Sequence, residues 1–237
     1  MTDALRRIRL WDLPVRLVHW SFAALLPALW WTAESGKIDL HKTLGLTMLG
    51  LVFFRILWGF YGSSTARFAN FVKGPETVLG YVRSLRENKK LTVIGHNPLG
   101  GWSVVLLLGL LGFQATIGLF TIDEDGLESG PLNYLVSFDT SDLLREAHGL
   151  VFNVILATLT VHLAAIAYYS VIKKDRLVPP MISGSRDIPA SLPAPRIAPL
   201  WQAIPAILLA AAFAYWLGMG APTSLTQNTA ASSEAYN

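Results

Sequence analysis

Two histidines, His148 and His162, are the residues whose type and spacing point most directly to chemistry, because they lie fourteen residues apart in one long apolar stretch. Four turns of α-helix span roughly 14.4 residues, so the two rings should project from nearly the same face, about 21 Å apart along the helix axis. That distance is most of the ~30 Å hydrocarbon core of a bilayer. One helix could thus hold a metal ligand near each membrane surface, a geometry suited to carrying electrons across a membrane.

Two further histidines supply partners, since His19 and His41 each lie at the start of another apolar segment. Consecutive membrane helices run in opposite directions, which places His19 at the depth of His162 and His41 at the depth of His148. Two cross-helix pairs at two depths can clamp two metal groups inside a helical bundle. Any one of these residues could instead be a simple interhelical hydrogen-bonding histidine, but four at matched depths favour metal sites.

The available ligands suit haem iron better than zinc. Two neutral imidazoles without a nearby carboxylate give fewer ligands than the three or four of a normal zinc site. Haem iron needs only two axial ligands from the protein, because the porphyrin supplies four nitrogens. The chain has no cysteine, which excludes iron–sulfur clusters and covalently attached c-type haem. We therefore expect two b-type haems, with His19, His41, His148 and His162 as the iron ligands.

The segments that carry these histidines have the composition of membrane-spanning helices. Hydrophobic residues make up 52% of the chain, charged residues 15%, and the mean hydropathy is +0.44, whereas ordinary soluble domains carry about 25% charge. The predicted fold is an all-α membrane protein: a four-helix transmembrane bundle that binds two haems, plus a fifth transmembrane helix that Pro205 interrupts in its first turns. Five apolar runs approach the ~20 residues of a spanning helix: 15–32, 43–61, 102–121, 148–171 and 200–219.

Changes in composition divide the chain into four parts. We expect a di-haem four-helix domain at 1–176, a proline-rich cytoplasmic linker without helix at 177–199, the fifth transmembrane helix at 200–220 and a disordered periplasmic tail at 221–237. The long connection inside the first part should hold a short amphipathic helix, around 75–87, along the membrane surface.

The charges of the loops predict the orientation in the membrane. Basic residues gather at the N-terminus, in the connection between the second and third apolar runs and after the fourth run, whereas the loop after the third run is acidic. By the positive-inside rule the N-terminus is cytoplasmic, the acidic loop is periplasmic and the C-terminus is periplasmic if the fifth helix spans. We expect a multi-pass protein of the bacterial inner membrane. Topology also explains the net charge of +3, so no nucleic-acid partner is expected.

Four basic side chains are candidates for binding haem propionates. Arg55 lies fourteen residues after the histidine of its own helix, so it should face the same side at the cytoplasmic depth. An arginine inside a membrane segment normally has an anionic partner, although it can also extend to the membrane surface. Arg16 could serve the same cytoplasmic haem or act only as a topology signal. Lys42 or Arg145 could serve the periplasmic haem.

The fifth histidine, His96, falls in a cytoplasmic turn and has no partner of matching depth. We expect it to be structural, or to line a quinone or propionate pocket, and not to be an axial ligand. A quinone site is expected at the cytoplasmic surface near His96, Arg67 and Arg16. Asn97 and Pro98, which follow it, indicate an N-cap and first turn that open the third membrane helix.

Several motifs resemble those of bacterial di-haem cytochromes b. They are WDLPVRLVHW at 11–20, LHKTLGL at 40–46, RILWGFYGSSTARF at 55–68, GHNPLGG at 95–101, REAHG at 145–149 and VHLAAI at 161–166. The resemblance covers about residues 8–186 and extends to the cytochrome b-561 group and the b-type cytochrome subunit of membrane-bound nickel–iron hydrogenases. It implies a four-helix bundle with two b haems on the same four histidines. It also implies electron transfer between membrane quinone and a redox partner, often periplasmic.

The leading functional hypothesis is transmembrane electron transfer between the quinone pool and a partner protein. A basic periplasmic c-type cytochrome would suit the acidic loop. One alternative is a stand-alone superoxide:quinone oxidoreductase, which needs a positive approach to the periplasmic haem, and Lys37, Lys42 and Arg145 are the only candidates for it. An alternative of another class is a small metal or proton transporter that uses intramembrane histidines as a relay.

Overall fold

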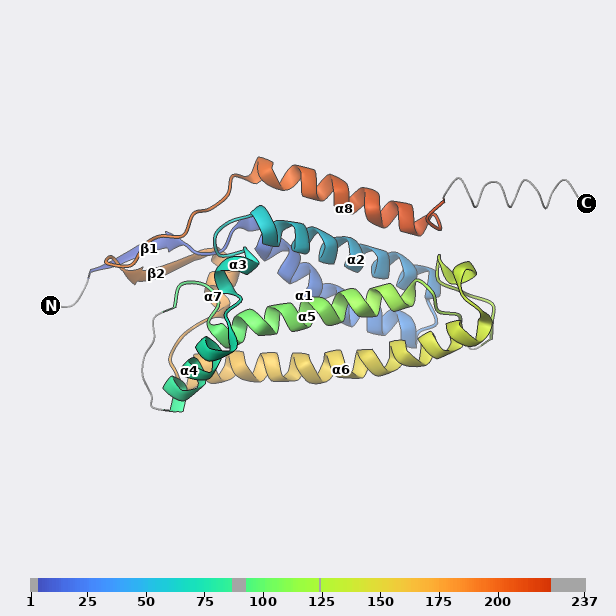
Figure 1. Cartoon of the computed structure of the whole chain (residues 1–237), viewed down its shortest axis with the longest axis horizontal. Coiled ribbons are helices and arrows are strands. Elements are labelled where there is room, and N and C mark those ends of the chain that lie inside the picture. The colour runs from blue at the N-terminus through green and yellow to red at the C-terminus, as the bar shows by residue number, and fades with distance from the viewer. Residues whose placement is uncertain (1–3, 87–92, 124, 223–237) are drawn as a thin grey trace, which may run out of the picture.

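The computed structural model describes residues 4–86, 93–123 and 125–222 as a bundle of long helices (Figure 1). Five helices are long and apolar enough to cross a membrane. Their presence confirms the predicted all-α membrane fold. Most of the tail expected to be disordered lies outside the described residues. The five helices are α1 (Leu13–Glu34), α2 (Ile38–Tyr61), α5 (Pro98–Gly118), α6 (Phe138–Val171) and α8 (Ala203–Gly218), the last preceded by the 3-10 turn η2 (Leu200–Gln202).

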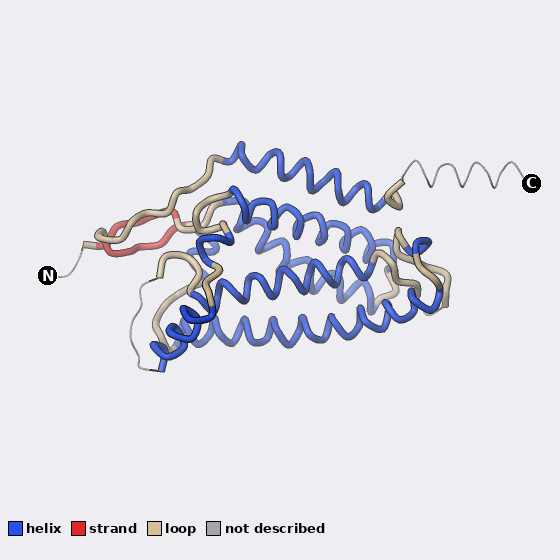
Figure 2. Tube along the Cα trace, in the orientation of Figure 1, coloured by secondary structure: helices blue, strands red, loops and turns tan. Residues whose placement is uncertain are grey.

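Short elements gather mainly at one end of the bundle, on the left in Figures 1 and 2. We call this the sheet end, and the opposite end, which carries the loop at 119–137, the loop end. The helix expected around 75–87 is confirmed as α4. The elements of the sheet end are β1 (Leu5–Arg9), α3 (Phe68–Phe71), α4 (Pro75–Arg86), α7 (Val178–Ser183) and β2 (Ser185–Pro189), and the 3-10 turn η1 (Asn133–Leu135) lies at the loop end.

The linker before α8 is more ordered than its proline content predicts. Its expected lack of helix is wrong, because α7 forms there and β2 then pairs antiparallel with β1, Leu5 opposite Pro189. Gly184 makes the change of direction possible, because its φ of +80° ends α7 in the left-handed conformation that glycine tolerates. Its carbonyl also accepts hydrogen bonds from the backbone N–H groups of Leu10 and Trp11. The linker is thereby tied to the segment that leads into α1.

Among α1, α2, α5 and α6, the closest backbone packing joins helices that follow one another along the chain. Within the described residues, α1 packs against α2, α2 against α5 and α5 against α6, whereas α1 and α6 share few close backbone contacts. Only Ser141 and Ile155 of α6 are buried. Helix α8 packs on the outer side of α2, where a Cβ on Gly50 would lie 3.2 Å from the side chain of Ala214. Small residues at such a crossing allow close helix approach in a membrane.

Side-chain caps fix where two of the histidine-bearing segments begin. Asp12 caps α1, and its Oδ1 accepts a 2.8 Å hydrogen bond from the Val15 N–H. Asn97 caps α5, as predicted, and its Oδ1 accepts from the Gly100 N–H at 2.8 Å. These bonds satisfy N–H groups that a helix start leaves without partners. They set the register of α1, which carries His19, and the position of the turn that holds His96.

Candidate metal centres

His41 and His148 form the better defined of the two predicted pairs, at the loop end. His41 lies near the start of α2, and His148 lies in the half of α6 that is nearer the loop end. Their ring centroids lie 6.2 Å apart, with the planes at 72°. Imidazole nitrogens bind metals at about 2 Å, so this separation leaves room for one metal ion bound to both rings. The structure therefore brings together the pair that sequence depth predicted.

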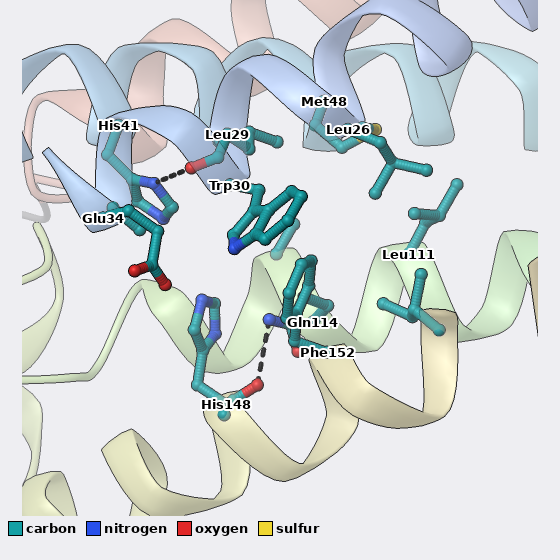
Figure 3. Close-up of a pocket in the computed structure, with 15 residues that line it drawn as sticks. Leu26, Leu29, Trp30, Glu34, His41, Met48, Leu111, Gln114, His148 and Phe152 are labelled. Atoms are coloured by element: carbon teal, nitrogen blue, oxygen red, sulfur yellow. Dashed lines mark hydrogen bonds between the residues drawn. The ribbon is translucent and has the colours of Figure 1, made fainter. Parts of the chain in front are cut away.

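A cavity of about 260 Å³ surrounds this pair and is lined by side chains from α1, α2, α5 and α6 (Figure 3). Two of its lining residues, Gly45 and Gly149, face open space where a Cβ would stand. A mostly apolar cavity with glycines beside two imidazoles fits a flat macrocycle with an iron at its centre. The apolar part of the lining includes Leu26, Leu29, Trp30, Met48, Leu111, Phe152 and Ile155.

The ring of His41 is held by the backbone of α1. Its Nδ1 lies 3.0 Å from the carbonyl oxygen of Leu29 and 3.2 Å from Oγ1 of Thr32, and Figure 3 shows the bond to Leu29. A carbonyl oxygen can only accept, so Nδ1 carries the ring proton. The lone pair of the neutral ring is then on Nε2, as in metal-binding histidines whose other nitrogen donates to a backbone carbonyl.

His148 is positioned by α5. A Cβ added to Gly118 would lie 3.1 Å from Cε1 of His148, so a glycine at this position leaves room for the ring. The side chain of Gln114 donates a 3.0 Å hydrogen bond to the His148 carbonyl oxygen, as Figure 3 shows. Nδ1 of His148 is buried without a hydrogen-bond partner in the described part of the chain. The ring is thus placed by packing, with no hydrogen bond to fix its tautomer.

His19 and His162 form the second predicted pair, at the sheet end. Both rings are half-buried, and they lie close enough to interact electrostatically. Nδ1 of His19 is buried and lacks a hydrogen-bond partner among the described residues. Their helices, α1 and α6, share few close backbone contacts, so a group that binds both rings would bridge the two helices.

Arg55 is buried, with an exposed fraction of 5%, and lies within electrostatic reach of His96, which in turn lies within reach of His19 and His162. Its Nη2 donates to the Ala66 carbonyl oxygen at 3.2 Å, while its Nη1 has no hydrogen-bond partner within the described residues. The carboxylate of Asp12 attracts it from a distance, without an ion-pair contact. A buried cation with a free donor is costly unless an anion meets it. A propionate at the sheet end would supply that anion.

His96 packs between two aromatic rings close to the same pair. Its ring centroid is 4.6 Å from that of Trp11 and 4.8 Å from that of Phe71. It lies within electrostatic reach of Arg55, His19 and His162. Burial lowers the pKa of His96 to about 3, so the ring stays neutral near pH 7. The sequence predicted a turn before α5 and either a structural role or a place in a quinone or propionate pocket, and the choice between these roles stays a prediction.

The other predicted propionate ligands already have partners in the protein. Lys42 forms ion pairs with Glu128 at 2.5 Å and with Asp39 at 3.2 Å. Arg145 pairs with Asp142 at 2.7 Å. Arg16 donates to the carbonyl oxygens of Met181 and Ile182 at the end of α7. Propionate binding by these three residues stays a prediction.

Sequence reasoning missed several residues that shape the sites. Thr32 carried no signal, because its contact with His41 depends on how α1 and α2 cross. Asp12 could have been found as an N-cap, because it lies directly before Leu13 and Pro14. Gln114 and Glu34, which line the loop-end cavity, could have been found as polar side chains inside or at the end of apolar helices. Among the described residues no group of three or more histidine, cysteine, aspartate or glutamate side chains could hold a metal ion. The donors come in pairs, which fits a metal that brings its own macrocycle.

Comparison with known sequences and structures gives one match. A sequence model of the family described as prokaryotic cytochrome b561 matches residues 10–184. The matched region contains α1, α2, α5 and α6 and every histidine of the chain, and it ends before β2 and α8. No curated protein and no solved structure matches.

Proposed function

The chain belongs to the prokaryotic cytochrome b561 family, whose members are helical membrane proteins that bind b-type haem and transfer electrons, and from this premise we propose that it carries electrons between the membrane quinone pool and a redox partner protein at the loop end. The proposal includes two haems, one at each end of the bundle. The observation that carries it is the facing of His41 and His148, with Nε2 of His41 left free by the bond from Nδ1 to Leu29.

Each haem site would take both of its axial ligands from the protein. We propose His41 with His148 at the loop end and His19 with His162 at the sheet end. When bound, haem b supplies a one-electron couple at each site. Two imidazoles fill both axial positions, which suits electron transfer better than reactions with small molecules. Arg55, through its free Nη1, would bind a propionate at the sheet end.

The distribution of charge supports an inner-membrane orientation with the sheet end in the cytoplasm. Arg6, Arg7 and Arg9 are exposed on β1 at that end, and the opposite end carries the acidic loop. Positive loops stay on the cytoplasmic side of bacterial membranes. The redox partner would then dock on the periplasmic side, and α8 would return the C-terminal end of the chain to that side.

The loop end offers a surface for a basic partner such as a small c-type cytochrome. Asp125, Asp139 and Glu146 are exposed there, together with Leu127 and Phe138, whose exposed fractions are 84% and 67%. Acidic groups around exposed apolar side chains favour a transient, salt-sensitive complex. Replacing the three acids by their amides should slow reduction of a basic c-type cytochrome about tenfold at low salt. The same change at Glu76 and Asp187, toward the sheet end, should not.

The same charges disfavour a direct reaction with superoxide. The approach to the loop-end site would need free cations, but of the three candidates Lys42 and Arg145 are paired with carboxylates and Lys37 lies over the ring of Trp31. An anionic substrate would also meet the acidic loop. The quinone would instead exchange electrons at the sheet end, near His96 and Arg16. The other residue expected there, Arg67, lines a separate small cavity.

The deciding experiment is a haem count on purified wild type and His162→Ala. Reduced-minus-oxidised spectra with a pyridine haemochrome assay should give two b haems per chain for wild type and one for the variant. His96→Phe is the matched control, because it removes a buried histidine beside the same site without removing a proposed ligand, and it should keep both haems. A haem count that His162→Ala leaves unchanged would refute the ligand assignment. A haem-free wild type would refute electron transfer and favour the transporter hypothesis.

A further inference from the structure

A second, smaller cavity lies at the sheet end, apart from both histidine pairs. Its volume is about 50 Å³, so it can hold a small charged group but not a flat ring. It lies where α2 ends and where the linker leads into η2 and α8. The residues that line it are Tyr61, Gly62, Arg67, Arg196, Ala198 and Gln202.

The lining of this cavity is positively charged and short of partners. Nε of Arg67 is buried without a hydrogen-bond partner, and the exposed Arg196 guanidinium has no ion pair or hydrogen bond in the described part of the chain. None of the lining residues is acidic. Two guanidinium groups beside one small cavity repel each other unless an anion lies between them. Phosphate oxygens are the acceptors that arginine binds most strongly, through paired charge-assisted hydrogen bonds.

The wall that carries Arg196 is fixed in place. The backbone N–H of Arg196 donates to Oγ of Ser64 at 3.0 Å, and the N–H of Ser64 donates back to the Arg196 carbonyl oxygen at 2.9 Å. The N–H of Ala198 donates to Oγ of Ser63 at 2.9 Å. These bonds join the linker to the turn after α2. The backbone of the cavity is therefore built before any ligand arrives, which reduces the entropy lost on binding.

Exposed aromatic and apolar side chains adjoin the lining residues along the chain. Phe60 has an exposed fraction of 70%, Trp201 of 66% and Leu200 of 57%. They lie at the ends of two membrane-spanning helices, the position of the aromatic belts that mark a membrane surface. A group bound in the cavity would thus lie at the level of lipid headgroups, with the apolar surfaces of α2 and α8 beneath it.

We propose that this cavity binds the phosphodiester group of an anionic membrane lipid, with Arg67 and Arg196 as its charged ligands and Gln202 and Tyr61 as hydrogen-bonding groups. Free phosphate has the same binding chemistry, but the exposed apolar side chains at the adjoining helix ends favour a ligand that carries acyl chains. The lipid would hold the linker and the start of α8 against the end of α2. The proposal does not depend on electron transfer.

The test is native mass spectrometry of the haem-loaded full chain after exchange into mixed phosphatidylglycerol and phosphatidylcholine. Wild type should retain one phosphatidylglycerol in preference to phosphatidylcholine. The double variant Arg67→Gln/Arg196→Gln should retain less phosphatidylglycerol, with a loss of about fivefold for each arginine removed. Arg196→Gln alone gives a second measurement, since that side chain is exposed and its loss should not disturb folding. The haem spectrum of each variant reports whether the bundle is intact.

Arg83→Gln is the matched control, because Arg83 is an exposed arginine of α4 at the same end of the bundle. An equal loss of lipid in this control would overturn the proposal in favour of a general surface-charge effect. Retention that is unchanged in the double variant would overturn it as well. If inorganic phosphate binds with the same dependence on Arg67 and Arg196 while phosphatidylglycerol is not retained, the ligand is a free anion and the lipid assignment is wrong.

Discussion

At the loop end, His41 and His148 face a mostly apolar cavity, whereas the sheet end, which holds His19 and His162, also contains a buried arginine. Within the part of the chain that the structure describes, Glu34 is the only charged side chain that lines the loop-end cavity, and it is exposed. At the sheet end, Arg55 is buried and has one nitrogen free. The two sites thus offer the same pair of ligands in different electrostatic surroundings.

This difference should give the two haems different affinities for an electron. A buried positive charge stabilises the reduced form, because reduction removes one positive charge from the iron. At the loop end the bond from the His41 Nδ1–H to the Leu29 carbonyl makes the imidazole more basic, which stabilises the oxidised form. Both effects predict a higher midpoint potential at the sheet end. Transfer of an electron from the loop-end haem to the sheet-end haem would then have a favourable free-energy change.

The largest expected effect is the loss of one haem at a time, which separates the two sites. His148→Ala should leave only the sheet-end haem and His162→Ala only the loop-end haem, because each removes one of two axial ligands. Redox titration of each variant then gives one midpoint potential. The remaining haem of His148→Ala should have the higher value. The reverse order would show that Arg55 does not set the difference.

Arg55→Leu should reduce the difference in midpoint potential between the two sites. Loss of the buried charge should lower the sheet-end potential on the order of 60 mV, which is tenfold for a one-electron couple. Arg55→Lys keeps the charge and should restore most of the shift. The redox titration should be done on the background of His148→Ala, in which only the sheet-end haem is left. An unchanged potential in Arg55→Leu would mean that the guanidinium does not act on this haem.

Gly118→Ala should weaken the loop-end site alone. The new Cβ would lie 3.1 Å from Cε1 of His148, and crowding of this kind costs roughly 1–3 kcal/mol. The expected result is a lower haem count in His162→Ala/Gly118→Ala than in His162→Ala. Gly109→Ala on the same helix is the control, because its Cβ would meet nothing within 4 Å. Equal counts for the two glycine variants would contradict the close fit of the His148 ring.

The membrane explains why so much of the fold could be predicted. A spanning segment must be helical and close to twenty residues long, so apolar runs give the helices and their alternating directions directly. Depth then follows from position along each helix, which is why His41 and His148 could be paired from the sequence and are found close together. The N-cap at Asn97 follows from local chemistry in the same way.

The sequence could not predict contacts between segments that are far apart along the chain, because these contacts do not follow from the position of a residue along a membrane helix. The strand β1 has the sequence LRRIR and pairs with residues about 180 positions later, so neither strand has a local signal. The contact of His41 with the Leu29 carbonyl depends on how α1 and α2 cross. Arg67 was expected near a quinone site, but the path of the linker places it in a cavity with Arg196.

Thr32→Val should give the smallest effect and tests how the His41 ring is held. Oγ1 of Thr32 donates to the Leu29 carbonyl at 2.9 Å, so at 3.2 Å from Nδ1 of His41 it acts as a second acceptor for the ring proton. Valine keeps the shape and removes this acceptor, while the bond to Leu29 is kept. A hydrogen bond worth about 0.5 kcal/mol corresponds to about 20 mV, so the loop-end potential should rise by that amount.

Thr47→Val is the control, because the Thr47 hydroxyl donates only to the backbone of its own helix. Redox titration on the background of His162→Ala gives the loop-end value, and a fall in place of a rise would mean that the Nδ1–H bond does not increase the basicity of His41.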